Sequence, residues 1–214
     1  MFKQICFFCY NINMIVKESS FIISVAEKNK ILNLPLKEFA FVGRSNCGKS
    51  SLINFLLGKK GLAKTSSTPG LTKLINYFSV NKNLENDCLF VDLPGYGYSK
   101  AGKKNHELWS NLMEDYLLGS QMLKRVFVLV DIRHEPNELD KLMTRFLYYH
   151  QIPFSVVATK ADKISKAQIG KQKSLIAKTL NLADGNILVC SSEGKIGKEQ
   201  ILNLIENDLK NTQN

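Results

Sequence analysis

The sequence lacks several features that mark whole classes of protein. No run reaches the roughly 18 apolar residues of a membrane-spanning helix. The five cysteines (Cys6, Cys9, Cys47, Cys88 and Cys190) are scattered, which is typical of a reducing cytosol and not of a disulfide framework. Cys6 and Cys9 form a lone C-x-x-C with no second pair and no nearby histidine, so a metal or redox role has little support. We expect a cytoplasmic chain without a membrane segment.

Acidic residues are also scarce relative to basic ones. The chain carries 29 Lys and Arg against 19 Asp and Glu, for a net charge of +10. Residues 39–84 hold no acidic residue but seven basic ones, and residues 160–178 hold six lysines against Asp162 alone. This balance favours a polyanionic partner, either a nucleic acid or an acidic membrane surface. Plain solubility and solvated helix faces are the alternative explanation.

The length and composition are those of one folded domain. The chain has 214 residues, of which 44% are hydrophobic, enough for a sizeable core. We expect residues 14–210 to form a single domain, residues 1–13 to be an upstream or loosely held extension, and residues 211–214 to be a short tail. Met14 is the expected natural start because regular patterning begins there.

A strand, a glycine-bounded loop and a helix follow one another near the start. The loop at 43–50 matches G-x-x-x-x-G-K-[ST] between an apolar run and a helical pattern. Its glycines let backbone N–H groups converge on an anion, and the helix N-terminus adds its own. Lys49 can reach β- and γ-phosphates, and the Ser50 hydroxyl suits Mg²⁺. A glycine turn that binds nothing is the alternative. The loop residues are Gly43, Arg44, Ser45, Asn46, Cys47, Gly48, Lys49 and Ser50.

Apolar runs and helical patterns alternate along the rest of the chain. The alternation predicts an α/β fold of the P-loop NTPase type, with a doubly wound, mostly parallel, six- to seven-stranded sheet flanked by helices. The short connection at 81–86 predicts a hairpin. Ligands then gather at the carboxyl ends of the strands. Expected strands are 21–25 (at an edge), 38–43, 74–80, 87–91, 125–130, 154–158 and 186–190, and expected helices are 49–57, 106–118, 138–150, 165–180 and 198–209.

A D-x-P-G box follows one of these strands directly. It consists of Asp92, Leu93, Pro94 and Gly95. An Asp at the carboxyl end of a strand beside the phosphate loop can hold a Mg²⁺-bound water, and Gly95 lets its N–H approach a γ-phosphate. Alone, this box is a common turn; its position downstream of a phosphate loop makes it specific.

A T-K-x-D box follows the later strand at 154–158, as Thr159, Lys160, Ala161 and Asp162. The Asp162 carboxylate can accept from both N1–H and the 2-amino group of guanine, whereas adenine would leave it unpaired at a cost of a few kcal/mol. The Lys160 stem can cover a base face. Backbone N–H groups near Ser191 and Ser192 can take the guanine O6. The pattern therefore predicts a guanine nucleotide.

These boxes together resemble the translation-factor-related P-loop GTPases, and more closely the EngB/YihA (YsxC) family of bacterial ribosome-biogenesis GTP-binding proteins. The finer resemblance is carried by the motifs at 43–50, 68–73, 92–98 and 131–136, and extends from Met14 to about Asp208. It implies hydrolysis of GTP to GDP and phosphate as a switch in large ribosomal subunit assembly, with a need for it in normal cell division and septation. It implies partners in the large-subunit precursor, its rRNA and ribosomal proteins, and a monomeric chain.

The resemblance also assigns roles to matching positions. Residues 43–50 bind phosphates, residues 92–95 form the second switch, and residues 159–162 read guanine. Leu71 and Lys73 depart from the family pattern at positions without an essential chemical group. The first switch is Gly70, Leu71, Thr72, Lys73 and Leu74; the base is supported by Cys190, Ser191 and Ser192; the catalytic set is Lys49, Thr72 and Gly95; and the Mg²⁺ set is Ser50, Thr72 and Asp92.

Two positions bear on the hydrolysis rate. Tyr96 stands where many GTPases place a glutamine, so we expect slow intrinsic hydrolysis that a partner stimulates. Relatives with an asparagine at the position of Asn46 use K⁺ as a counter-charge, by the same resemblance; stabilisation of the turn is the alternative. Two rival functions stay open at this point. One is a small-molecule kinase and the other is an RNA-binding module with a vestigial nucleotide pocket.

Overall fold

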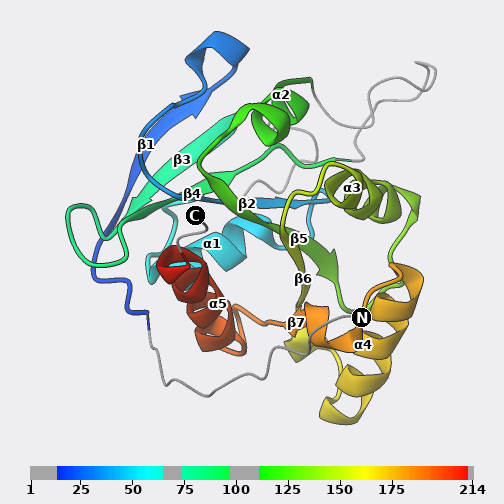
Figure 1. Ribbon diagram of the computed structural model, residues 1–214. Helices are drawn as coiled ribbons and strands as arrows, with labels where there is room; N and C mark the ends of the chain where they lie inside the picture. Colours follow the sequence, from blue (N-terminus) through cyan, green and yellow to red (C-terminus); the bar gives the residue numbers. More distant parts are fainter. Residues whose placement is uncertain (1–13, 65–73, 97–110, 212–214) are drawn as a thin grey trace.

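The computed structural model describes residues 14–64, 74–96 and 111–211. These residues form a seven-stranded sheet flanked by five α-helices (Figure 1). In this part of the chain no helix is long and apolar enough to span a bilayer. The strands are β1 (Ser19–Val25), β2 (Glu38–Gly43), β3 (Ile75–Val80), β4 (Cys88–Asp92), β5 (Leu123–Asp131), β6 (Phe154–Thr159) and β7 (Ile187–Val189). The helices are α1 (Lys49–Leu57), α2 (Asn111–Gly119), α3 (Glu138–Tyr149), α4 (Lys166–Thr179) and α5 (Lys198–Lys210).

The sheet is mostly parallel, as the alternation predicts. Its order is β1-β3-β4-β2-β5-β6-β7. The central strand β2 pairs in parallel with β4 and β5, and β6 and β7 continue the parallel run. The β3–β4 pair is an antiparallel hairpin, and β1 lies antiparallel to β3 at one edge. The expected hairpin and edge strand are therefore confirmed.

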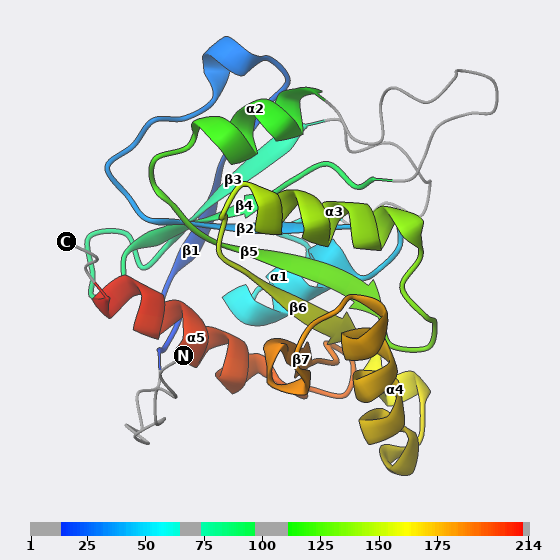
Figure 2. The same ribbon diagram turned by 45° about the vertical axis from the view of Figure 1, so that its right-hand side comes forward.

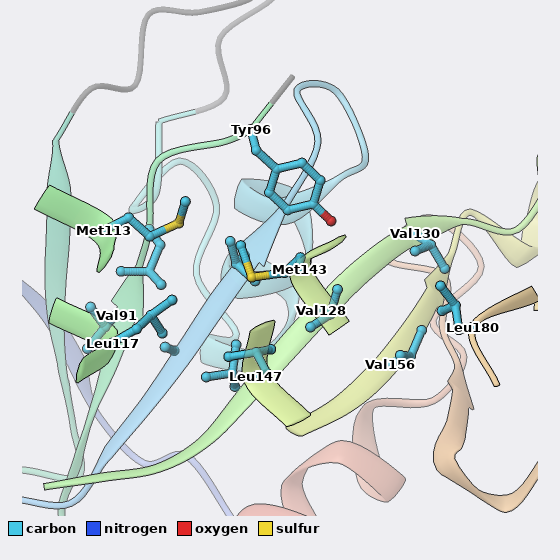
Figure 3. Packing of buried hydrophobic residues seen from close by; sticks show 14 of the residues in the cluster. Val91, Tyr96, Met113, Leu117, Val128, Val130, Met143, Leu147, Val156 and Leu180 are labelled. Carbon is cyan, nitrogen blue, oxygen red and sulfur yellow. The ribbon is translucent and has the colours of Figure 1, made fainter. Parts of the chain in front are cut away.

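The central strands are buried on both faces, and large and small side chains alternate between these faces. Phe39, Phe41 and Phe127 point to the side covered by α1 and α5. The phenyl rings of Phe41 and Phe127 stack at 5.2 Å between centroids. Smaller residues such as Val42 and Val128 face α2, α3 and α4. Figure 2 shows α2 and α3 above the sheet and α1 and α5 below it, and Figure 3 shows the packing under α2 and α3. The sheet is thus held rigidly between two layers.

Several element ends differ from the expected ones. The fourth helix begins at Lys166, not Ser165, because Ser165 is an N-cap in a capping box with Gln168. The last strand covers only Ile187–Val189, since Asn186 belongs to a short 3₁₀ turn. The helix expected at 106–118 is observed from Asn111 to Gly119, and residues 106–110 lie outside the described part. The expected extension at residues 1–13 and the tail from 212 also lie outside it.

Candidate functional site

The loop between β2 and α1 has the backbone that an anion-binding turn requires. Gly48 caps α1 with φ +96°, a conformation that side chains disfavour, and Asn46 adopts φ +64°. A Cβ on Gly43 would lie 2.6 Å from Cys47 Sγ and 2.8 Å from the Leu129 carbonyl oxygen. Only glycine fits position 43, because the loop folds back against β5. The first N–H groups of a helix have no partner within it, so the start of α1 offers the donors that an anion site needs.

Lys49 and Asp92 meet beside this loop. The Lys49 ammonium donates to an Asp92 carboxylate oxygen, and their side chains are only 9% and 4% exposed. Asp92 ends β4, the neighbour of β2, so the parallel pairing brings the two boxes to one edge of the sheet. A buried ion pair between Lys49 and Asp92 therefore lies where the phosphate loop ends and α1 begins.

The D-x-P-G box packs directly on the phosphate loop. A Cβ on Gly95 would lie 3.3 Å from the Gly43 carbonyl oxygen and 3.4 Å from the Ser45 nitrogen. The Tyr96 N–H donates to the Gly43 carbonyl at 3.3 Å. The backbone at Gly95 can come this close because position 95 has no side chain.

The Tyr96 side chain is buried in the core cluster on the α2 and α3 side of the sheet. Its hydroxyl donates to Asp140 at 2.8 Å, and the ring is 1% exposed. Figure 3 shows this ring lying over Met143 of α3. Burial, with the adjoining Asp140 carboxylate, raises the Tyr96 pKa well above its usual range. Asp140 also accepts from the Asn137 N–H in the α3 capping box. Sequence reasoning missed Asp140, since nothing in the sequence links it to Tyr96.

The T-K-x-D box is anchored to the same loop by its first two side chains. The Thr159 hydroxyl donates to the Cys47 carbonyl at 2.6 Å and sits 3.1 Å from that of Val130. The Lys160 ammonium donates to the Asn46 carbonyl at 2.7 Å. Two boxes that are more than 100 residues apart therefore form one continuous surface.

Asp131 belongs to the motif at 131–136 that carries the resemblance, but the sequence analysis gave it no role in the site. Its carboxylate pairs with Lys160 at 2.9 Å and with Arg133 at 2.7 Å. Burial alone would raise the Asp131 pKa, but the hydrogen bonds from Arg133 and Lys160 outweigh it and hold that pKa well below its usual range. Asp131 ends β5 and Lys160 follows β6, and the parallel pairing of these two strands brings their ends together. Asp131 therefore holds the Lys160 stem in place.

Asp162 is positioned by the segment after β7. The Ser191 hydroxyl donates to Asp162 and accepts from the Gly194 N–H at 2.7 Å. The Ala161 N–H donates to the Cys190 carbonyl at 3.2 Å. The Ser191 hydrogen bond lowers the Asp162 pKa, so this carboxylate is ionised at neutral pH.

The two cysteines of the site are buried and unreactive. Burial raises the pKa of the Cys47 thiol to about 11 and that of Cys190 to about 12. Both thiols therefore stay protonated near neutral pH, where a thiolate would be the reactive form. Their contribution is packing behind the phosphate loop and behind the segment that holds Asp162.

The structure thus brings most of the predicted site residues together. The phosphate loop, the D-x-P-G box, the T-K-x-D box and the segment at 190–192 all follow the carboxyl ends of parallel strands. Ser50 lies in the first turn of α1 and Ser192 is half-buried after β7. Leu74 immediately precedes β3. Gly70, Leu71, Thr72 and Lys73, which carry most of the expected first switch, lie outside the described residues.

Comparison with known proteins gives a consistent result. Residues 38–160 match the family model described as 50S ribosome-binding GTPase. The probable GTP-binding protein EngB of Clostridium kluyveri is 46% identical over 194 residues, covering 90% of this chain and 96% of that protein. The EngB protein of Clostridium perfringens is 46% identical over 197 residues, covering 92% and 98% of the two chains.

Solved structures share the fold. A crystal structure of a probable GTP-binding protein EngB superposes with a TM-score of 0.61 at 23% identity, covering 81% of this chain and 98% of that one. Because the curated relatives are nearly half identical along almost the whole chain, the sequence comparison carries the assignment. The chain belongs to the EngB family of GTP-binding proteins and is a GTPase.

Proposed function

We propose that this GTPase is a nucleotide-dependent switch in assembly of the large ribosomal subunit, needed for normal cell division. The observation that carries the proposal is the match of residues 38–160 to a family described as 50S ribosome-binding GTPase. The net charge of +10 supports contact with rRNA, because phosphates attract lysine and arginine. The partners are then the large-subunit precursor, its rRNA and its ribosomal proteins. The acting species is a cytoplasmic monomer folded over residues 14–210.

We infer that the phosphate loop and the D-x-P-G box hold the triphosphate. Lys49 reaches the β- and γ-phosphates, and the Gly95 N–H contacts the γ-phosphate from its place against Ser45. Thr72, from the segment outside the described residues, is the second γ-phosphate contact. When hydrolysis removes the γ-phosphate, the segments that carry Gly95 and Thr72 each lose a contact. The loss of these contacts is the physical cause of the switch.

Magnesium fits the oxygen donors at this site. The Ser50 hydroxyl and the Asp92 carboxylate follow neighbouring strands, and among the residues that the structure describes no three His, Cys, Asp or Glu come together. Mg²⁺ suits such a site because it takes few protein oxygens and keeps phosphates and waters as its other ligands. Ser50 and Thr72 would be direct ligands and Asp92 would hold a bound water. The ion, when bound, neutralises phosphate charge.

We infer that guanine lies between the T-K-x-D box and the segment after β7. Asp162, kept ionised by Ser191, accepts from N1–H and the 2-amino group of the base. The Lys160 stem, fixed by Asp131 and the Asn46 carbonyl, covers one face. Backbone N–H groups near Ser191 and Ser192 take O6. This donor and acceptor arrangement selects guanine because adenine offers no matching donors.

The intrinsic hydrolysis is proposed to be slow. The Tyr96 hydroxyl is committed to Asp140, so the position that follows Gly95 supplies no group to orient the attacking water. K⁺ held by the Asn46 side chain, or a ribosomal partner, would then supply the missing stimulation. Asn46 is exposed, which leaves its side chain free to do so, but its φ of +64° also gives it a role in the turn.

The two roles of Asn46 can be separated. Asn46→Gly removes the side-chain amide but tolerates the left-handed turn. If the side chain holds K⁺, wild type turns over GTP faster in K⁺ than in Na⁺ and Asn46→Gly shows no such difference. Equal wild-type rates in the two buffers, measured as phosphate release, contradict the K⁺ proposal.

The ribosomal role is tested by co-sedimentation with purified ribosomal subunits. We expect the protein to pellet with the large subunit in the presence of a non-hydrolysable GTP analogue and to remain in the supernatant with GDP. The bound fraction should fall across a salt series because phosphate contacts release counterions. Equal binding with the GTP analogue and with GDP, or stronger binding to the small subunit, would refute the proposal.

A further inference from the structure

A hollow lies at the end of the sheet opposite to the proposed nucleotide site. It has a volume of about 1090 Å³ and is formed by the C-terminal ends of α3 and α4 with the start of β6. Figures 1 and 2 show α3 over the middle of the sheet and α4 farther along it, toward β7. The phosphate loop lies at the carboxyl ends of the strands, which places it roughly 20 Å away from this groove. We call it the α3–α4 groove.

Two tyrosines line the α3–α4 groove and are almost fully exposed. Tyr148 is 79% and Tyr149 81% exposed, more than any other large apolar or aromatic residue in the described part of the chain. The Tyr149 ring stands edge-on to His150 at 4.9 Å, and His150 packs on Phe146 at 4.5 Å. The contact with His150 therefore holds the Tyr149 ring in one orientation, although most of the residue is exposed to solvent. Exposed aromatic faces are the surfaces on which unpaired bases stack.

The charge of the groove fits a polyanion. Its lining holds Lys141 and Arg145 and no carboxylate, although the Glu135 carboxylate accepts from the lining residue Thr179 at 3.0 Å. Lys141 is engaged by Glu138 at 2.8 Å, whereas Arg145 forms no ion pair with any described residue. Lys178, exposed on α4, lies next to the lining residue Thr179. Arg145 is thus the lining cation available to a backbone phosphate.

The groove also presents amide side chains with unused hydrogen-bonding capacity. Gln151 follows α3 and Asn181 follows α4, each with a left-handed backbone and an exposed side chain. Neither side-chain amide has a partner among the described residues. An amide carries both donors and an acceptor, as base edges require. Exposed rings, an unpaired cation and amides without a lining carboxylate favour single-stranded RNA over an acidic peptide, which needs no stacking surface.

We propose that the α3–α4 groove binds an unpaired RNA segment, with bases stacked on Tyr148 and Tyr149 and a phosphate on Arg145. This rests on the proposed contact with ribosomal RNA and names the surface and the form of the RNA. Paired bases cannot reach the rings, so the groove discriminates single strands from duplexes. Its distance from the phosphate loop lets it bind RNA without displacing the nucleotide.

The test uses the full chain and a fluorescent single-stranded RNA of about 12 nucleotides, followed by anisotropy. The double variant Tyr148→Ala/Tyr149→Ala should bind this RNA at least about tenfold more weakly than wild type. Tyr148→Phe/Tyr149→Phe, which keeps both rings, should bind within about twofold. Affinity for GTP and the unfolding midpoint should be unchanged in both variants, because the rings are exposed and remote from the phosphate loop.

Charge is tested separately. Arg145→Ala should lower the slope of log affinity against log salt by about 0.7, the share of one phosphate contact on a single strand. The matched control Lys166→Ala, an exposed cation of α4 outside the groove, should leave the slope unchanged. A duplex of the same sequence should bind more weakly than the single strand.

The outcomes separate this proposal from the ribosomal role. Wild-type affinity in the double alanine variant, or a preference for duplex, overturns the groove proposal even if wild type pellets with ribosomal subunits. An alanine variant that loses the subunit but keeps the RNA oligonucleotide overturns it in favour of a ribosomal protein as partner. Wild type that binds GTP but no subunit refutes the ribosomal role itself.

Discussion

At the scale of single residues, base selection in the proposed function depends on Asp162. Asp162→Asn removes the carboxylate that accepts from two guanine donors, so we expect GDP affinity to fall roughly 10- to 150-fold, the value of a charge-assisted hydrogen bond. Asp184→Asn, on an exposed carboxylate bonded to Ser174, is the matched control. Titration with a fluorescent GDP analogue measures both variants. Near-wild-type affinity in Asp162→Asn would show that guanine is held elsewhere.

Gly43 shows how one missing side chain fixes the phosphate loop. Gly43→Ala places a Cβ against the Leu129 carbonyl and Cys47 Sγ, so we expect a loss of about 1–3 kcal/mol in unfolding free energy and weaker nucleotide binding. Gly170→Ala, in the interior of α4 with nothing within 4 Å of the new Cβ, should instead gain about 0.5–1 kcal/mol. Urea unfolding of the two variants decides. If Gly43→Ala and Gly170→Ala have the same unfolding free energy, the phosphate loop accommodates the added Cβ without strain.

At the scale of elements, Tyr96 ties the segment after β4 to the N-terminus of α3. Tyr96→Phe removes the hydroxyl that serves the buried Asp140, so we expect about 1–2 kcal/mol of destabilisation with GDP affinity retained. Denaturant unfolding and GDP titration measure the two effects. The exposed Tyr148→Phe is the control, and it should change neither. A large loss of GDP affinity in Tyr96→Phe would instead place the hydroxyl in nucleotide binding.

The same contact explains why the Tyr96 side chain is unavailable for water positioning. Met143 and the α3 capping box surround its ring and hydroxyl. A side chain with this much buried area and a partnered hydroxyl does not leave its site without a large cost. Stimulation of hydrolysis is therefore expected to come from an ion or a bound partner.

At the scale of the whole molecule, the buried carboxylate of Glu38 makes stability depend on pH. Glu38 is 1% exposed at the start of β2 and accepts from Tyr116 at 2.8 Å and Ser120 at 2.7 Å. Burial raises the Glu38 pKa above its usual 4.5, against the opposite effect of these hydrogen bonds. The folded state thus holds this proton more tightly than the unfolded state. Its contribution to stability is full below pH 4.5 and is lost as pH rises through the folded pKa.

The direction of this pH dependence can be tested with Glu38→Gln, whose side chain cannot ionise. The unfolding free energy of the variant relative to wild type should increase as pH is raised from about 4.5 to neutral, because only wild type loses the Glu38 contribution. Urea midpoints across this range measure the trend. Exposed Glu85→Gln should show no such trend. A flat difference for Glu38→Gln would show that another group sets the pH response.

Much of the architecture could be predicted from local pattern. The bounds of β2 and α1 are those expected, since an apolar run, a glycine turn and a helical period follow one another without ambiguity. The last strand was overestimated because Asn186, which directly precedes the apolar residues of the strand, belongs to a 3₁₀ turn. Family membership also decides against the rival small-molecule kinase.

The sequence by itself determined that the phosphate and base boxes each directly follow a strand, because their spacing and flanks are local. Only the tertiary structure decided which side chains hold those boxes in place. The Lys160–Asp131 pair, the Tyr96–Asp140 hydrogen bond and the α3–α4 groove all join residues from different elements. Such contacts depend on how strands are ordered and how helices cover them, and local periodicity carries no information on either.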